Sequence, residues 1–323
     1  MLALFSAGSP FQASPDPQKR NQRLIQIGCE MRDALARTVR GYVLLLVTIA
    51  LAGCIHQQQK PTSMGAATFA GNLSQCCLNP EKYPAWLVDL VEPAAPLVGR
   101  TIAHVVWRQG YLANGMAQRA ILSVLKPLDI LVLSSKGRMS GHTIPGLFGH
   151  TAIYLGTETE LRQMGAWDDP RIVPYQKRIR AGAMMIEADQ DGIHLSPARS
   201  VLNADRVVVL RPHLTSNRRR REVITGFVEH IGQRFDFHFD NASSERLYCT
   251  ELINHVMPEA GLPARRLYGR QSTLPDEVVA RAAIGKSNLN LVLYVRSLSP
   301  QWESASRRML VADIASACHS KAD

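Results

Sequence analysis

The sequence has little of what marks several common classes of protein. Its six cysteines among 323 residues are too few for a small disulfide-framed domain. It contains no Gly-rich phosphate loop, no G-x-S-x-G nucleophile elbow and no repeat of fixed period. Charged residues make up only 20% of the chain and hydrophobic residues 46%, which excludes a mostly disordered protein. We therefore expect a globular chain with a sizeable core.

An apolar segment near the N-terminus is too short to span a bilayer as a helix. Residues 41–53 read GYVLLLVTIALAG, whereas a spanning helix needs about 20 apolar residues. Arg32, Arg37 and Arg40 precede the segment, and small residues end it just before Cys54. A basic region, a short apolar stretch and a small-residue cleavage site predict a secretory signal peptide. A short buried helix is the alternative interpretation.

The sequence LAGC at residues 51–54 resembles the lipobox of bacterial lipoproteins. The resemblance implies cleavage before Cys54 and attachment of a diacyl group, with chains such as palmitate, to its thiol; two acyl chains give stable anchoring. Because Ile55 rather than an Asp follows, it implies the outer membrane, facing the periplasm. We expect residues 1–30 to be an upstream extension, residues 31–53 the signal peptide, and residues 54–79 the lipidated cysteine with a tether.

The chain is basic, with 37 Lys and Arg residues against 27 Asp and Glu residues and a net charge of +10. Arg218–Arg221 form a run at the start of a predicted helix, and our leading interpretation is a solvated helix face. Contact with anionic lipid headgroups is the alternative, worth about 1 kcal/mol per basic residue near such a surface. An exported chain without an RNP or zinc-finger pattern is not expected to bind nucleic acid.

Short runs of β-branched and aliphatic residues predict a sheet. Gly, Pro and Asp bound most of these runs, which cover residues 128–133, 151–155, 183–188, 206–210 and 291–295. Helical periodicity covers residues 84–124, 217–232 and 249–257, and another helix follows Pro275. We predict one α+β domain over residues 80–310, with a small, mainly antiparallel sheet packed against helices, and a C-terminal tail over residues 311–323. Cys76 or Cys77 is a weak candidate partner for Cys318.

Cys249 is the first candidate for chemistry. Leu252, Ile253, Val256 and Met257 form an apolar helical stripe that places this cysteine in the first turn of a helix. The positive end of a helix favours a thiolate, and its unpaired N–H groups can hold a developing oxyanion. A buried and inert cysteine is the alternative, since free cysteines are often buried.

Two polar residues on predicted strands complete a candidate thiol site. His150 begins a strand after a glycine, and alternation puts it on one face with Ala152 and Tyr154. Glu187 is a lone carboxylate among four apolar neighbours, and a carboxylate on a core strand is costly unless it is paired. A structural histidine and an outward-facing glutamate are the alternatives. Thiol, imidazole and orienting carboxylate are the groups that thiol attack on a carbonyl needs.

Five segments follow one another in the order KPLDILVLSS, GHTAIYLG, IEADQDGI, GQRFDFHFD and LYCTELI. In this order the chain is similar to the circularly permuted NlpC/P60 papain-like family, YiiX-like group, over roughly residues 125–276. In that group the histidine strand precedes the cysteine helix. The resemblance implies a papain-like fold in which Cys249 is the nucleophile, His150 the base and Glu187 the residue that orients the base.

The resemblance extends to two acidic residues that we interpret as structural. Asp129 matches the acidic residue of the first strand motif, where it would hold the start of the strand. Glu251 matches the glutamate after the cysteine, where an acidic residue in the first turn of a helix is favourable.

One position departs from the family pattern. The family commonly has a tyrosine whose hydroxyl helps bind the oxyanion, and here Phe235 stands in its place. Loss of one oxyanion donor typically costs about 2.7–4 kcal/mol in the transition state. We expect the backbone N–H of Cys249 and another donor such as Tyr248 to compensate for this loss. Without such compensation, turnover would be weak.

These observations predict an envelope-anchored thiol hydrolase, of amidase, peptidase or acyltransferase type, that forms an acyl-thioester at Cys249. Its expected substrate is an amide of the cell-wall peptide or a lipid acyl bond. A catalytically weak or inactive lipoprotein that binds lipid or peptidoglycan is the alternative, motivated by Phe235. We expect no cofactor and no metal, because His238 and Asp240 form a pair without a third ligand at metal spacing.

Overall fold

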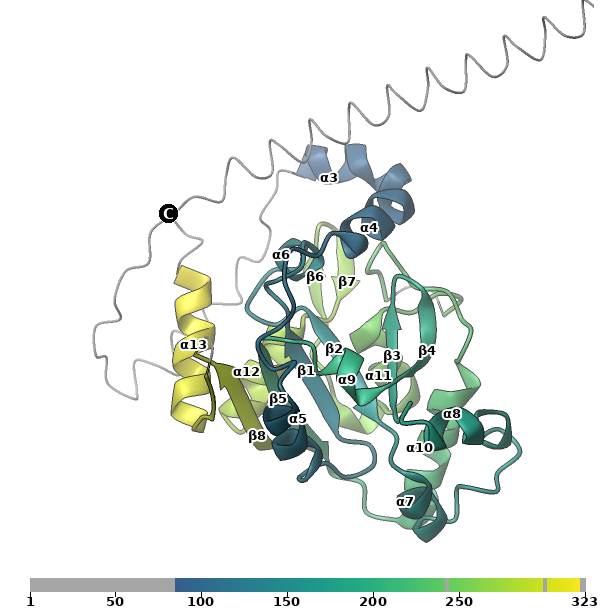
Figure 1. Cartoon of the computed structure of the whole chain (residues 1–323). Coiled ribbons are helices and arrows are strands. Elements are labelled where there is room, and N and C mark those ends of the chain that lie inside the picture. Colours follow the sequence, from purple (N-terminus) through teal and green to yellow (C-terminus); the bar gives the residue numbers. More distant parts are fainter. Residues whose placement is uncertain (1–84, 242–243, 299–300, 320–323) are drawn as a thin grey trace, which may run out of the picture. The chain divides into compact units, whose positions relative to one another are not determined.

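The computed structural model describes residues 85–241, 244–298 and 301–319 (Figure 1). The predictions for residues 1–79, including the lipidation of Cys54, fall outside these ranges. The same holds for Cys76, Cys77 and the side chain of Cys318. Within the described ranges, no helix combines the length and apolar character needed to cross a membrane.

Seven strands form one sheet in the order β4-β3-β2-β1-β5-β8-β9, and all neighbouring strands in it are antiparallel. The strands of this sheet are β1 (Ile130–Ser134), β2 (His150–Tyr154), β3 (Met185–Asp189), β4 (Gly192–Ser196), β5 (Arg206–Pro212), β8 (Leu289–Ser297) and β9 (Trp302–Ser304). A separate hairpin joins β6 (Arg265–Leu267) and β7 (Arg270–Ser272). The five predicted strands are thus confirmed, and the sheet is larger than predicted.

Helices precede the sheet, interrupt it and follow it. In chain order the helical elements are α3 (Ala85–Val91), η1 (Glu92–Ala94), α4 (Ala95–His104), α5 (Gly115–Leu122), α6 (Ser140–Thr143), α7 (Glu158–Gln163), η2 (Val173–Tyr175), α8 (Gln176–Arg180), α9 (Ala198–Val201), α10 (Asn217–Glu229), α11 (Cys249–Val256), η3 (Pro258–Ala260), α12 (Pro275–Ala283) and α13 (Arg307–His319). The predicted helices over 217–232 and 249–257 and after Pro275 correspond to α10, α11 and α12.

Apolar side chains fill the space on both faces of the sheet. One cluster joins the sheet to α7, α8, α10, α11, α12 and α13, and the other joins it to α5 and α9. On β2, Ile153 belongs to the first cluster, whereas Ala152 and Tyr154 belong to the second. This is the alternation that a strand buried on both faces requires. The α+β class is therefore confirmed.

The predicted end of the domain at residue 310 is wrong. The chain continues as α13, and Leu310 and Ile314 on this helix are fully buried in the main cluster. They are four residues apart and so lie on one face of the helix. Val311, Ala312 and Asp313 separate them, and only small or polar residues follow Ile314 in the helix, so the helical pattern of this segment is weak.

An ion pair holds the start of β1. The fully buried Asp129 accepts hydrogen bonds from Arg211 at 2.7 and 2.6 Å and from the backbone N–H of Lys126 at 2.8 Å. The turn from Lys126 to Asp129 places Leu128 at a φ of 76°, which is costly for a residue with a side chain. The predicted structural role of Asp129 agrees with these contacts.

Replacing Asp129 by alanine should therefore lower the free energy of unfolding by about 2–4 kcal/mol, because Arg211 and the turn lose a charged partner. Denaturant unfolding measures this change. Glu222→Ala is the control: Glu222 pairs with Arg218 in solvent, so its loss should leave the midpoint nearly unchanged. Equal stability of the two variants would contradict the role assigned to Asp129.

Candidate active site

The start of α11 is fixed by hydrogen bonds on both sides of Cys249. Thr250 Oγ1 donates to the carbonyl of Thr273 at 2.8 Å, and the backbone N–H of Thr273 donates to the Tyr248 hydroxyl at 2.8 Å. The Tyr248 hydroxyl itself donates to Asn241 Oδ1. Cys249 is the first residue of the helix and is only 4% exposed. Its thiol therefore lies at the positive end of a helix whose position is firmly held.

His150 and Glu187 meet across neighbouring strands. Glu187 on β3 is paired in register with Ala152 on β2, and His150 lies two residues before Ala152 on the same strand. His150 Nε2 is 2.7 Å from Glu187 Oε2. Because an ionised carboxylate only accepts hydrogen bonds, Nε2 carries the proton of this bond. Nδ1 is then the ring nitrogen left for the thiol.

The ionisation of Cys249 and His150 is coupled. Burial opposes the charged form of each, yet the interaction between them prevails, so the pKa of the Cys249 thiol falls below its ordinary value. The pKa of the His150 imidazole rises well above its ordinary value, because Cys249 and Glu187 together outweigh the burial of the ring. These directions favour a thiolate beside an imidazolium.

Glu187 keeps its charge although it is only 8% exposed. Burial raises the pKa of its carboxyl group, but the hydrogen bond from His150 outweighs burial and the net pKa is lowered. The partner that the sequence analysis predicted for a carboxylate on this strand is therefore present. The structure brings Cys249, His150 and Glu187 together.

A buried loop anchor for His150 was missed by the sequence analysis. Asp276, in the first turn of α12, accepts hydrogen bonds from the backbone N–H groups of Leu147 and Phe148 at 2.7 and 2.6 Å. These residues immediately precede Gly149 and His150. Asp276 follows Pro275, which marked the helix, but nothing in the sequence indicated which loop its carboxylate would hold.

Thr151 is a second residue that the sequence analysis missed. Its hydroxyl is buried without a hydrogen-bond partner. Both this hydroxyl and the backbone N–H of Thr151 lower the pKa of the Cys249 thiol. Alternation places Thr151 on the opposite face of β2 from Ala152, and its polarity there was the available signal.

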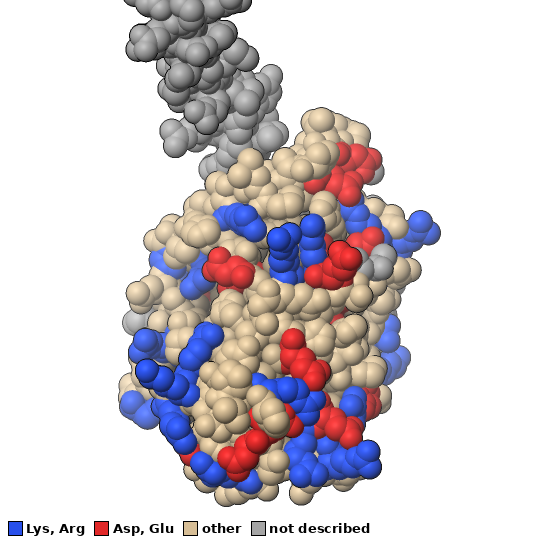
Figure 2. Space-filling model, turned by 90° about the vertical axis from the view of Figure 1, so that its right-hand side faces the viewer, with Lys and Arg blue, Asp and Glu red and all other residues tan. Residues whose placement is uncertain are grey.

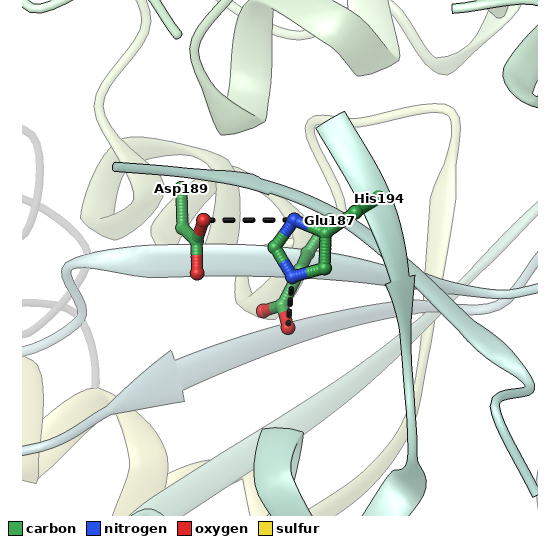
Figure 3. Close-up of side chains that lie close together, drawn as sticks. All are labelled: Glu187, Asp189 and His194. Carbon is green, nitrogen blue, oxygen red and sulfur yellow. Dashed lines mark ion pairs between the residues drawn. The ribbon is translucent and has the colours of Figure 1, made fainter. Parts of the chain in front are cut away.

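A second imidazole approaches Glu187 from β4 (Figure 3). His194 Nε2 is 3.9 Å from Glu187 Oε1, and His194 Nδ1 is 3.6 Å from Asp189 Oδ1. Among the residues that the structure describes, these three form the group that could hold a metal ion, with ligand atoms within 4.8 Å of one another. A cation there would compete with His150 for Glu187, so we assign no metal to this group.

The two predicted auxiliary residues do not offer a free side-chain donor. The hydroxyl hydrogen of Tyr248 is engaged with Asn241, and its backbone N–H donates to Glu251 Oε2 at 3.3 Å. Phe235 packs in an aromatic cluster, with ring centroids 4.9 Å from Phe237 and 5.8 Å from Phe239. Help from Tyr248 in binding an oxyanion would require these hydrogen bonds to break.

Glu251 is structural for a different reason from the one predicted. Burial, together with the nearby charges of Asp236 and Asp240, raises the pKa of its carboxyl group to about 8, although the N–H of Tyr248 opposes this rise. The group is therefore mostly neutral at pH 7 and contributes a hydrogen-bond acceptor at the start of α11 rather than a negative charge.

An antiparallel sheet with a cysteine helix packed on it and a histidine on a central strand defines a papain-like cysteine amidase or peptidase. Residues 125–293 match the family of permuted papain-like amidase enzymes described as YaeF/YiiX, C92 family, and the chain belongs to this family. The predicted resemblance is thus confirmed. No curated protein and no solved structure matches the chain.

The coupled pKa values predict an unusual pH dependence for alkylation of Cys249. The thiol pKa is lowered and the imidazole pKa raised, so the reaction should already be fast at about pH 6, well below the ordinary thiol value of about 8.5. In His150→Ala, burial of the thiol is opposed only by the weaker influence of Thr151, so the rate should collapse at that pH and recover only in alkali. The exposed His255→Ala is the control, and peptide mapping identifies the labelled cysteine. A single rise near pH 8.5 in both wild type and His150→Ala would contradict the ion pair.

Thr151→Val should reduce the alkylation rate at about pH 6 by about three- to tenfold, the equivalent of one hydrogen bond to the thiolate. Thr151→Ser keeps the hydroxyl and should retain most of the rate. Because the hydroxyl has no hydrogen-bond partner, valine should not lower the thermal midpoint. An unchanged pH profile in Thr151→Val would show that the hydroxyl does not act on the thiol.

Proposed function

We propose that this chain is an envelope-anchored amidase that acts through an acyl-thioester at Cys249. The observation that carries the proposal is the contact chain from Glu187 through His150 to a buried cysteine at the start of α11. Membership of a permuted papain-like amidase family supports the same class of reaction. The LAGC sequence before the domain supports anchoring through Cys54.

The first half of the reaction transfers the acyl group to sulfur. The Cys249 thiolate attacks the carbonyl carbon of the substrate amide, and the carbonyl electron pair moves to oxygen. When the tetrahedral intermediate collapses, its C–N bond breaks and Nδ1–H of His150 gives its proton to the leaving nitrogen. The amine departs, and the acyl group remains on Cys249 as a thioester.

The second half returns the site to its starting state. His150, now neutral, takes a proton from water as the water oxygen attacks the thioester carbonyl. The C–S bond breaks, the acid departs and the thiolate–imidazolium pair is restored. An acceptor hydroxyl or amine in place of water would give acyl transfer instead. Glu187 stays ionised throughout and fixes the ring orientation and the proton on Nε2.

The oxyanion is held by backbone groups in this proposal. The first N–H groups of a helix lack partners within the helix, and those at the start of α11 lie beside the sulfur of Cys249. This arrangement suits a chain with phenylalanine at position 235, because it needs no tyrosine hydroxyl. The same substitution favours the alternative function, a lipoprotein that retains the fold and binds wall peptide or lipid without turnover.

The substrate is an amide of the cell-wall peptide or a lipid acyl bond, and the acyl group left on Cys249 distinguishes the two. The full chain should be mixed with muropeptides or with phospholipid vesicles, quenched in acid and digested for mass spectrometry. We expect a mass increase on the Cys249 peptide that equals a peptidyl or a fatty acyl group. Cys249→Ala should carry no such adduct, and Glu187→Gln should accumulate it more slowly.

A Cys249 that alkylates rapidly at low pH but forms no thioester with either substrate would favour the binding function. A slow thiol with no thioester would exclude both halves of the proposed reaction.

A further inference from the structure

Exposed large hydrophobic side chains gather in the segment that precedes the sheet. Trp86, Leu90, Leu97 and Trp107 are 66%, 68%, 58% and 54% exposed. Val105 and Val106, next to Trp107, are exposed as well. We call these six residues the apolar end. Single exposed hydrophobic residues are ordinary, whereas a group of them on one segment marks an interaction surface.

The helices of the apolar end carry most of its exposed apolar side chains, together with the exposed Asp89 and Arg100. On α3, Trp86 and Leu90 are four residues apart and so share one face, whereas Leu97 lies on α4, beyond η1. Leu87 and Val88, on the other side of α3, are only partly buried, and neither η1 nor α4 contains a fully buried residue. In the described part of the chain, the domain therefore covers at most one face of these helices and leaves their exposed apolar side chains without apolar surroundings.

The charge distribution points to an apolar partner rather than a polyanion. Glu92, one of the few acidic residues of this segment, is paired with Arg270 at 2.5 Å and lies 3.6 Å from His238. Figure 2 shows that the upper end of the molecule, where Figure 1 places α3 and α4, has a broad uncharged surface beside one acidic patch. Lys and Arg are more frequent lower on the same face. Tryptophan is also the side chain that is enriched at the membrane–water boundary.

The position of the apolar end in the sequence indicates which apolar environment would cover it. Trp86 is the second residue of α3, and residues 55–84 connect this helix to Cys54, the predicted site of lipidation. A surface at the end of such a tether is held close to the membrane that carries the acyl chains. We propose that the apolar end docks into the boundary between headgroups and acyl chains of that membrane, an inference that rests on the proposed anchoring at Cys54.

Docking would hold near the lipid the two segments that lead to active-site residues, one to Cys249 and the other to His150. Gly99 of α4 packs so closely on Phe237 that an added Cβ would lie 2.4 Å from the Phe237 ring, and Phe237 belongs to the loop that leads to Cys249. On the other side, the carbonyl of Val105 accepts from the N–H of Met139 at 3.0 Å, and the Trp107 ring lies 5.4 Å from that of His142. The segment of Met139 and His142 leads to His150.

Tryptophan fluorescence in vesicles with brominated acyl chains tests the docking directly. The chain has four tryptophans, all of them after residue 84, so quenching by bromine reports on the domain and not on the tether. The full chain is added to phosphatidylethanolamine–phosphatidylglycerol vesicles, and cosedimentation is measured separately. We expect wild-type fluorescence to be quenched, and Trp86→Phe/Trp107→Phe to lose the quenching because its remaining tryptophans lie outside the apolar end.

Leu90→Glu/Leu97→Glu keeps all four tryptophans and places two charges in the apolar end. This variant should cosediment through its anchor yet lose most of the quenching. The matched control is Val173→Glu/Leu298→Glu, which changes two residues that are 51% and 50% exposed elsewhere on the domain. It should be quenched like wild type. Alkylation of Cys249 at about pH 6 verifies that each variant is folded.

The outcomes separate docking from anchoring. Wild-type chain that cosediments without quenching would overturn docking and leave the anchor intact. Chain that stays in the supernatant would overturn both. If quenching is absent and the Leu90→Glu/Leu97→Glu variant instead converts a dimer to a monomer in gel filtration, a second copy of the chain covers the apolar end and docking on lipid is wrong.

Discussion

An ionised carboxylate inside an apolar sheet needs a cationic partner, and Glu187 has His150. Glu187 lies on β3 between the buried residues Ile186 and Ala188, with β2 and β4 on either side. The imidazolium that stabilises it is stabilised in turn by the thiolate of Cys249. Each group therefore holds its neighbour in the charged form. The arrangement of β2, β3 and the start of α11 keeps these three charged groups in contact. Loss of His150 would leave two buried anions without a cation, which is far more costly than loss of a surface ion pair.

Much of this arrangement could be predicted from local pattern. Short runs of β-branched and aliphatic residues predicted β2 and β3, and the apolar stripe of α11 placed Cys249 in the first turn, because burial on one side imposes a period of 3.6 on helices. Glu187 could be predicted to have a partner because its apolar neighbours made an unpaired carboxylate too costly. The ordered series of short segments then indicated the family and, through it, the match between His150 and a catalytic base.

The remainder depends on contacts between segments that are distant in sequence. β4 was not predicted, since its five residues include His194 and its pairing depends on the position of β3. Leu128 was assigned to a strand, but the ion pair of Asp129 bends the chain there and β1 begins at Ile130. The Tyr248 hydroxyl bonds to Asn241 and to the backbone N–H of Thr273. Neither composition nor periodicity could predict these two hydrogen bonds. The unpaired hydroxyl of Thr151 is likewise visible only once the helix lies on the sheet.

The permuted chain order affects how the site assembles when the chain emerges N-terminus first. β2 and β3 both precede α11 in the chain and are neighbours in the sheet. The imidazole and its carboxylate can therefore pair before the cysteine joins them. The sulfur becomes a reactive thiolate only when it reaches that pair, and at that moment it is also buried. Because the thiolate is the form that oxidises to sulfenic acid, this order keeps the sulfur of the unassembled chain in the less reactive thiol form. A chain with the opposite order would expose its nucleophile first.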